Sequence, residues 1–320
     1  MGNITETTIK KRDKKNRKRK YQLLAFVMGS MFLCCIIFLI AYLSGLHRAE
    51  EDLEDMRASY VSLQGERVQP RPEEPGNTDT SMSEQNPEGN TPSEPDSGAA
   101  IASDESEPEP AAPDAEQPDY GLEGKTVDIA ALQEDINEHI YAWLSVPGTV
   151  IDFPVVQHPE EMDYYLEYNL DGTKGRPGGI YTQRMNSKDW TDPNTIIYGH
   201  NMRNGTMFAD LHKFEDRDFF DENRYIHIYT EGGEILIYEI FAAYVTDNRH
   251  QLMIWSLDTE EGYQSYLDAV PEHTGKGCNF REDIHPTTED KILTLSTCVY
   301  QQNDKRYLVQ GVLVAREEQP

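Results

Sequence analysis

Cysteine is scarce in this chain of 320 residues, and its placement excludes a disulfide framework. Two of the four cysteines, Cys34 and Cys35, lie in a long apolar segment, which leaves only Cys278 and Cys298 for the rest of the chain. A single bridge between these two is one interpretation, and a retained free thiol is the other. The HExxH and paired CxxC spacings of zinc sites are also missing, as is a Gly-rich phosphate loop. No metal and no cofactor are implied.

Charged side chains are absent from residues 21–46, YQLLAFVMGSMFLCCIIFLIAYLSGL. As a helix this segment is long enough to cross a hydrocarbon core of roughly 30 Å. The twenty residues before it carry nine Lys or Arg against two acids, and the flank after it is acidic. The positive-inside rule therefore predicts a basic cytoplasmic tail at 1–20, an uncleaved transmembrane signal anchor at 21–46, and an extracytoplasmic remainder.

Basic residues nearly disappear from the part of the chain that follows. Residues 68–119 hold 14 acids and 10 prolines against Arg71 alone. Such a composition cannot bury enough apolar surface to fold, so we predict a disordered acidic linker over residues 68–125. Just ahead of it, apolar residues at three- and four-residue spacing predict a short juxtamembrane helix within residues 47–67.

Residues 126–320 carry periodic apolar segments throughout and are numerous enough for one core of ordinary size. They hold 34 acids and 15 bases, a net charge of −19. A surface of this sign argues against nucleic-acid partners, because phosphate contacts need clustered Lys and Arg. We expect a single folded domain here.

An amphipathic helix is predicted to open this domain, since DIAALQEDINEHIYAWL places Ile129, Leu132, Ile136, Ile140 and Trp143 on one helical face behind a capping Asp128. Short segments rich in β-branched and aromatic residues predict the strands TVIDFPVVQ, GGIYTQ, NTIIYGH, RYIHIYT, EILIYEIFAAYV, KILTLSTC and RYLVQGVLV.

The connections between these strands suggest the architecture. Glu231-Gly232-Gly233 predicts a hairpin turn between two of the strands. Helices are expected near MFADLHKF and near TEEGYQSYLDAV. The pattern favours a mainly β fold, a closed antiparallel β-barrel of about seven or eight strands decorated with helices.

One strand ends at a cysteine, and the next predicted strand begins at an arginine. Seven residues, VYQQNDK, separate Cys298 from Arg306, so a long hairpin loop would bring the thiol and the guanidinium to neighbouring strand ends. A guanidinium stays protonated and can stabilise a thiolate or an oxyanion. A thiol of this kind needs a base, and His200 at the end of TIIYGH is the best placed of nine histidines.

The other histidines offer weaker candidates. His227 lies inside the alternating YIHIY and is interpreted as a strand residue of surface or core. The remaining histidines sit in helix or loop contexts without an evident partner: His139, His158, His212, His250, His273 and His285.

YGHN around His200, TLSTC ending at Cys298 and RYLVQGVLV starting at Arg306 resemble the sortases, membrane-anchored cysteine transpeptidases of Gram-positive bacteria. The resemblance covers nearly all of residues 126–317. Within the family the chain is similar to class B, which has a helix before the barrel and an extra helix before the cysteine strand. The segments PGTVIDFPVVQ, YYL and IIYGHNMRNGTMF carry that similarity.

The resemblance implies a sortase catalytic domain at 126–320, in which Cys298 is the nucleophile, His200 the proton donor and acceptor, and Arg306 the oxyanion or substrate clamp. It implies that Cys298 attacks the Thr carbonyl of a C-terminal sorting motif on a secreted protein. An amine of a peptidoglycan precursor would then resolve the thioacyl enzyme and attach the protein to the cell wall. Positions matching the substrate groove are Leu166, Tyr198, Ser296 and Thr297.

Two residues depart from the class B pattern. Val299 follows the nucleophile where an acid is frequent, and Met162 stands where an Asn is frequent. The sorting motif is therefore either of the Asn-Pro-x-Thr-Asn type or of the Pro-x-Thr-Gly type. A pilin-polymerising sortase is an alternative function. A tethered β-barrel binding module, in which Cys298 is only a core residue, is a third.

Overall fold

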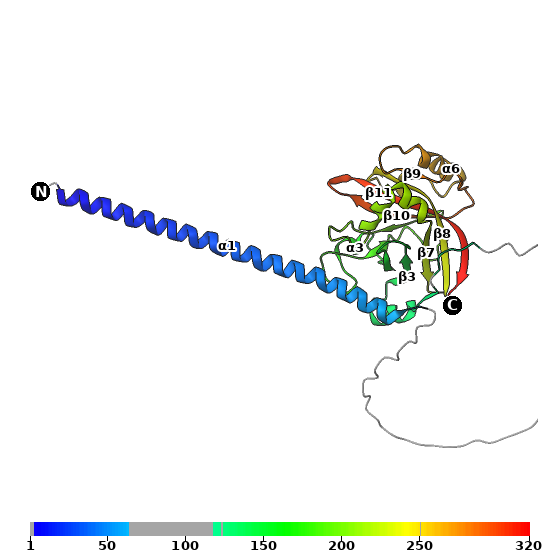
Figure 1. Ribbon diagram of the computed structural model, residues 1–320, viewed down its shortest axis with the longest axis horizontal. Helices are drawn as coiled ribbons and strands as arrows, with labels where there is room; N and C mark the ends of the chain where they lie inside the picture. The colour runs from blue at the N-terminus through cyan, green and yellow to red at the C-terminus, as the bar shows by residue number, and fades with distance from the viewer. Residues whose placement is uncertain (1–2, 64–117, 123, 250) are drawn as a thin grey trace, which may run out of the picture. The chain divides into compact units, whose positions relative to one another are not determined.

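The protein is described from a computed structural model, which covers residues 3–63, 118–122, 124–249 and 251–320 (Figure 1). Most of the linker expected at 68–125 lies outside these residues. The side chains of the basic tail lie outside them as well. The tail and the linker stay predictions.

A single long helix, α1 (Asn3–Tyr60), opens the chain. It contains Phe26–Gly45, which by length and composition is apolar enough to cross a membrane. The helix continues through most of the expected juxtamembrane region. At its end, β1 (Val61–Leu63) pairs antiparallel with β2 (Lys125–Val127).

The last turns of α1 pack on the domain. Met56 is buried in a hydrophobic cluster with residues of the barrel, and Leu53 contacts a second one. The Arg57 guanidinium donates to the carbonyl of Asp152 at 2.6 and 3.0 Å. The backbone N–H of Asp128 donates to the carbonyl of Tyr60 at 3.0 Å. These contacts make the end of α1 part of the folded domain.

Eight strands close the barrel, which confirms the expected closed β-barrel. Their order is β11-β10-β6-β5-β4-β3-β7-β8, and β11 also pairs with β8, so that no edge is left between them. All seven predicted strands are present. The strands are β3 (Ile140–Ser145), β4 (Asp152–Val156), β5 (Ile180–Thr182), β6 (Asn194–Tyr198), β7 (Tyr225–Thr230), β8 (Glu234–Asp247), β10 (Ile292–Val299) and β11 (Gln302–Glu318), with the short β9 (Asn279–Phe280) beside β8.

The pairing is not antiparallel throughout. β6 runs parallel to β10, and β4 runs parallel to β5. A parallel pair needs a crossover connection, and the chain between β6 and β10 holds a hairpin and several helices that supply one. Figure 1 shows β10 and β11 side by side, with α6 (Glu260–Ala269) near β9. The predicted turn between β7 and β8 is confirmed, and Gly233 there has φ of 82°.

The opening helix is shorter than the sequence pattern suggests. It is α2 (Ile129–Asp135), capped by Asp128, whose carboxylate accepts from the Ala131 N–H at 2.9 Å. Ile140 and Trp143 belong instead to β3, a strand buried along nearly its whole length. A strand buried on both faces shows no alternation, so its apolar residues also fit helical spacing. Both other predicted helices are present, as η1 (Ala209–Glu215), a 3-10 helix, and as α6.

The remaining helices are short connecting elements. They are α3 (Tyr164–Glu167), α4 (Arg217–Glu222), α5 (Gln251–Ile254) and η2 (Val270–Glu272).

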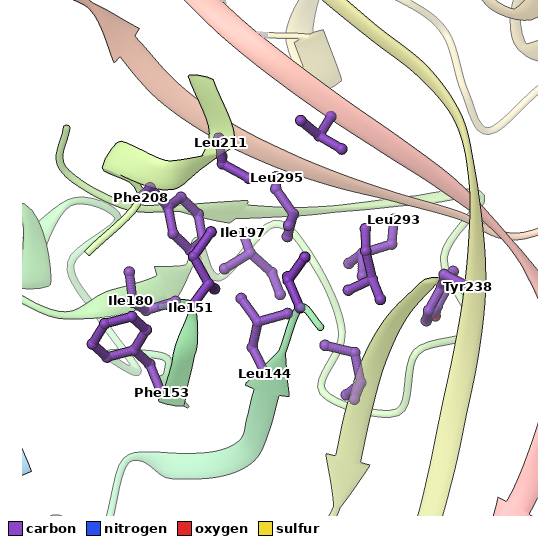
Figure 2. Close-up of a cluster of buried hydrophobic side chains, with 14 of the residues drawn as sticks. Leu144, Ile151, Phe153, Ile180, Ile197, Phe208, Leu211, Tyr238, Leu293 and Leu295 are labelled. Carbon is purple, nitrogen blue, oxygen red and sulfur yellow. The ribbon is translucent and has the colours of Figure 1, made fainter. Parts of the chain in front are cut away.

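The barrel interior is filled by one large hydrophobic cluster (Figure 2). Leu144, Ile197, Leu293 and Leu295 are fully buried in it, and each comes from a barrel strand. Figure 2 also shows Phe208 and Leu211 reaching this cluster from the segment around η1. The core thereby fixes η1 against the ends of β6 and β10, where the candidate site lies.

Acid should destabilise the domain through His227, whose side chain is only 2% exposed in β7. Burial, together with the charge of Lys125, lowers the pKa of His227 to about 4, although the Nε2 contact with the Tyr120 carbonyl at 2.9 Å opposes the shift. The unfolded chain takes up this proton near pH 6.5, so stability is full above that pH and falls toward pH 4. We expect a loss of about 2–3 kcal/mol between pH 7 and 4.5.

The measurement is urea unfolding of the wild type and of His227→Gln at these two pH values. Gln keeps a donor for the Tyr120 carbonyl but does not titrate. An equal pH dependence in both proteins would rule out His227 as the source.

Candidate active site

Three neighbouring strands end at the candidate site. In β10 and β11, Cys298 lies directly opposite Arg306. On the other side of β10, the parallel pairing of β6 sets Tyr198 opposite Ser296, so His200 follows two residues beyond the end of the ladder. The strand register therefore brings the ends that carry the cysteine, the histidine and the arginine to one rim of the barrel.

The expected seven-residue loop between β10 and β11 is wrong. β10 runs to Val299 and β11 starts at Gln302, which leaves only a two-residue turn. Gln301 in this turn has φ of 61°. A register shift follows Cys298, and the extra residues of β11 are accommodated there as an irregularity. Cys298 and Arg306 are nevertheless paired in the strand register.

Hydrogen bonds tie the His200 segment to the Cys298 segment. The Gly199 N–H donates to the carbonyl of Ser296 at 3.2 Å. The Thr297 hydroxyl donates to the carbonyl of Gly199 at 2.8 Å, and the Asn201 amide donates to the carbonyl of Cys298 at 2.9 Å. The two segments therefore keep their relative positions through their backbones as well as through strand pairing.

Two glycines allow the close packing around His200. A Cβ at Gly199 would lie 2.5 Å from a side-chain carbon of Ile180 and 2.6 Å from the Phe208 ring. Gly178 has φ of 74°, and a Cβ there would lie 2.6 Å from the Tyr165 carbonyl oxygen. Larger residues at either position would displace the segments that hold the imidazole.

His200 is half-buried, and its Nε2 lies 2.8 Å from the carbonyl oxygen of Leu166 in α3. A carbonyl only accepts, so Nε2 carries the proton and Nδ1 holds the lone pair in the neutral ring. Burial lowers the pKa of His200, and the charge of Arg176 acts in the same direction, while the bond to Leu166 opposes both. At neutral pH the ring is therefore mostly the neutral base.

The charge of Arg306 affects the pKa of two tyrosines, Tyr181 and Tyr198. The rings of Tyr181 and Tyr198 stack at 5.5 Å between centroids. Burial raises the pKa of each phenol, whereas the charge of Arg306 opposes this shift in both. The Arg306 Nη1 also donates to the carbonyl of Lys305 at 2.9 Å. The charge of the guanidinium therefore acts on Tyr181 in β5 and on Tyr198 at the end of β6.

The four residues matched to a substrate groove differ in exposure. Leu166 is 41% exposed and Tyr198 is half-buried, so both can contact a ligand. Ser296 and Thr297 are buried, at 5% and 2% exposure. The Thr297 hydroxyl is already bonded to Gly199, which makes the positioning of the His200 segment its evident use. Substrate contact by any of the four stays a prediction.

Both cysteines of the domain are free thiols, so the alternative of a Cys278–Cys298 bridge is wrong. Cys298 is half-buried at the end of its strand. Val299, where an acid is frequent in class B, packs partly buried against the barrel core. A free thiol, a mostly neutral imidazole and a guanidinium are groups that can serve nucleophilic acyl transfer.

Two residues contact the site from distant parts of the chain, and the sequence alone assigns neither of them a role. Asn201 and His212 both contact the carbonyl of Cys298, from 97 and 86 positions away in the chain. His212 has no motif that marks it. Its spacing of three residues from Glu215 on a short helix is the one signal that could have pointed to it.

Comparisons with known proteins identify the family. A family model for the sortase domain matches residues 144–314. Sortase B of Listeria monocytogenes is 33% identical over 197 residues, which are 61% of this chain and 78% of that protein.

Solved structures show the same similarity. A Staphylococcus aureus sortase B-substrate complex matches with a TM-score of 0.51 and 26% identity, over 58% of this chain and 84% of that one. A Streptococcus pyogenes class B sortase involved in pilus biogenesis matches with a TM-score of 0.50 and 28% identity, over 58% and 97% of the two chains. The chain therefore belongs to the sortase family of cysteine transpeptidases and, within it, to class B.

Proposed function

We propose that this protein cleaves a C-terminal sorting motif of secreted proteins at the Thr carbonyl and transfers them to an amine of a peptidoglycan precursor. The observation that carries the proposal is the strand register, in which Cys298 faces Arg306 while the adjacent strand end carries His200. The family of the chain supports the same chemistry. The proposed role is covalent anchoring of surface proteins to the cell wall.

In the first half-reaction, the Cys298 sulfur attacks the Thr carbonyl carbon, and its proton passes to the neutral His200 ring. The carbonyl oxygen becomes an oxyanion, which the Arg306 guanidinium stabilises. When the scissile C–N bond breaks, His200 gives the proton to the leaving amine. The product is a thioester between Cys298 and the substrate.

In the second half-reaction, an acceptor amine attacks the thioester carbon. His200 takes the proton of the amine, and the C–S bond breaks as the new amide forms. The proton then returns to the sulfur, so the enzyme ends as it began. Hydrolysis is the same step with water in place of the amine.

The motif is proposed to be of the Asn-Pro-x-Thr-Asn or the Pro-x-Thr-Gly type. Leu166, at 41% exposure beside His200, and Tyr198 are the groove residues best placed to contact it. The apolar segment Phe26–Gly45 in α1 supports a single-pass anchor with the N-terminus in the cytoplasm and the catalytic domain outside. Substrates that emerge from secretion would then meet the enzyme at the same membrane.

Pilin polymerisation is the second candidate. The observation in its favour is the match to the Streptococcus pyogenes class B sortase involved in pilus biogenesis. Here the acceptor would be a lysine side chain of another subunit. The chemistry at Cys298 is the same, and only the amine differs.

The deciding experiment incubates the full-length protein in detergent with fluorogenic peptides of both motif types. Each peptide is combined with a peptidoglycan-type amine or with a lysine-containing pilin peptide, and products are identified by mass spectrometry. We expect a peptide–amine conjugate linked through Thr. Conjugation to the pilin lysine alone would favour polymerisation, and cleavage of neither motif would overturn the proposal.

A further inference from the structure

The carbonyl of the nucleophile Cys298 is held by two side chains. It accepts from the Asn201 amide at 2.9 Å and from the His212 Nε2 at 3.1 Å. The register shift after Cys298 interrupts the regular ladder at this residue. A carbonyl oxygen has two lone pairs, and the two side chains occupy both. The backbone that carries the sulfur is thus fixed by side chains at the point where strand pairing becomes irregular.

His212 is itself held from two further sides. Its Nδ1 lies 2.6 Å from a carboxylate oxygen of Glu215. Its ring stacks on Tyr307, with centroids 5.0 Å apart and planes 26° apart. Tyr307 is fully buried opposite Thr297, and its hydroxyl donates to the carbonyl of Gly277 at 3.0 Å. The imidazole therefore has a defined position behind the cysteine strand.

The helix that carries His212 is anchored on both sides of it. Leu211 and Phe214 are fully buried in the barrel core. The His212 side chain contacts the cysteine strand and is 21% exposed. The Cys298 carbonyl only accepts, so the ring nitrogen that faces it, Nε2, is the donor. Glu215 contacts the His212 ring, and the ring in turn contacts the Cys298 carbonyl.

We propose that His212, backed by Glu215, is a positioning residue for the transpeptidation. It donates to the carbonyl of Cys298 and so fixes the direction of the Cα–Cβ bond from which the sulfur reaches the substrate. This inference rests on the proposed function, in which Cys298 is the nucleophile. His212 does not touch the reacting atoms, and its effect is on kcat because a small misplacement of a nucleophile slows the chemical step.

Two substitutions separate the hydrogen bond from the ring. His212→Phe keeps a ring that can stack on Tyr307 but removes the donor. His212→Gln removes the ring, yet its amide nitrogen reaches about as far as Nε2 and can donate to Cys298. We expect kcat to fall about tenfold in His212→Phe with KM within twofold, and to stay within about threefold of the wild type in His212→Gln.

Glu215→Gln tests whether the backing of the ring depends on the carboxylate charge. Its amide can donate to Nδ1 of a neutral ring, which leaves the Nε2 proton for Cys298, so kcat should fall less than in His212→Phe. A wild-type kcat in His212→Phe would overturn the proposal. Equal losses in the Phe and Gln variants would overturn it as well, because the ring and not the donor would then matter.

If His212→Phe is much less stable than the wild type, the variants His212→Asn and His212→Gln are compared instead. Asn at position 212 reaches only as far as Nδ1, toward Glu215, so His212→Asn should lose activity while His212→Gln retains it. Equal activities in this pair would refute the role of the donor.

The rate of Cys298 alkylation by a charged thiol reagent is measured in every variant. We expect it to fall in His212→Phe and not in His212→Gln. This readout needs no sorting peptide, so it tests His212 even where the wild type cleaves no peptide and the proposed function itself fails. An unchanged alkylation rate in His212→Phe would count against the positioning role.

Discussion

Cys298→Ala is expected to abolish cleavage of a sorting peptide, with a loss of about four orders of magnitude or more in kcat/KM. The reason is that the proposed route runs through a thioester, and alanine offers no atom to form it. Cys298 is half-buried at the rim and free of a disulfide, so its removal should leave the fold intact. The measurement is the rate of fluorogenic peptide cleavage alongside a thermal melt.

Cys278→Ala is the control, since Cys278 is the other free thiol of the domain and packs at the edge of the cluster under α6. Its activity should stay close to that of the wild type. Cleavage that persists in Cys298→Ala would show that the nucleophile is elsewhere. A wild-type Cys298 that resists a charged thiol reagent would instead support a non-catalytic binding module.

His200→Ala should lower the cleavage rate by about three orders of magnitude, because it removes the group that takes and returns the proton. The folding cost should be small. His200 is only half-buried, and its ring contacts the carbonyl of Leu166, a residue of α3 that is 41% exposed. Rates and melting temperatures of the two proteins provide the measurement.

His285→Ala, at an exposed position, is the matched control and should behave like the wild type. Partial recovery of His200→Ala by added imidazole would strengthen the assignment of a proton-transfer role. A loss of thermal stability as large as the loss of rate would favour a structural role for His200 instead.

Much of the barrel could be predicted, because most of its strands are short segments rich in β-branched and aromatic residues and bounded by turn residues. β3 is the exception. All its residues from Ile140 to Leu144 are buried, so periodicity alone could not separate a strand from a helix. The parallel pairings of β6 with β10 and of β4 with β5 also depend on contacts that no local pattern records.

The sequence predicts that the candidate site lies at strand ends, but it does not predict how the neighbouring segments are connected and bonded. The sequence pattern does not predict the start of β11, because Gln302, Asp304 and Lys305 are polar and are typical of a loop. In the folded chain Gln302 pairs with Val299 of β10, and Lys305 lies opposite Asp247 of β8. The bond from His212 to Cys298 joins residues 86 positions apart. Only the tertiary fold brings these two residues together.

Because β1 pairs with β2, the length of the acidic segment between them should have little effect on the folded domain. Leu63 lies opposite Lys125, so the two ends of the segment that contains the acidic stretch lie side by side. The entropy of closing such a loop grows only with the logarithm of its length, at about 0.6 kcal/mol per doubling. Insertions or deletions within residues 68–117 should therefore be tolerated. The contacts of the last turns of α1 with the domain are independent of the length of this segment.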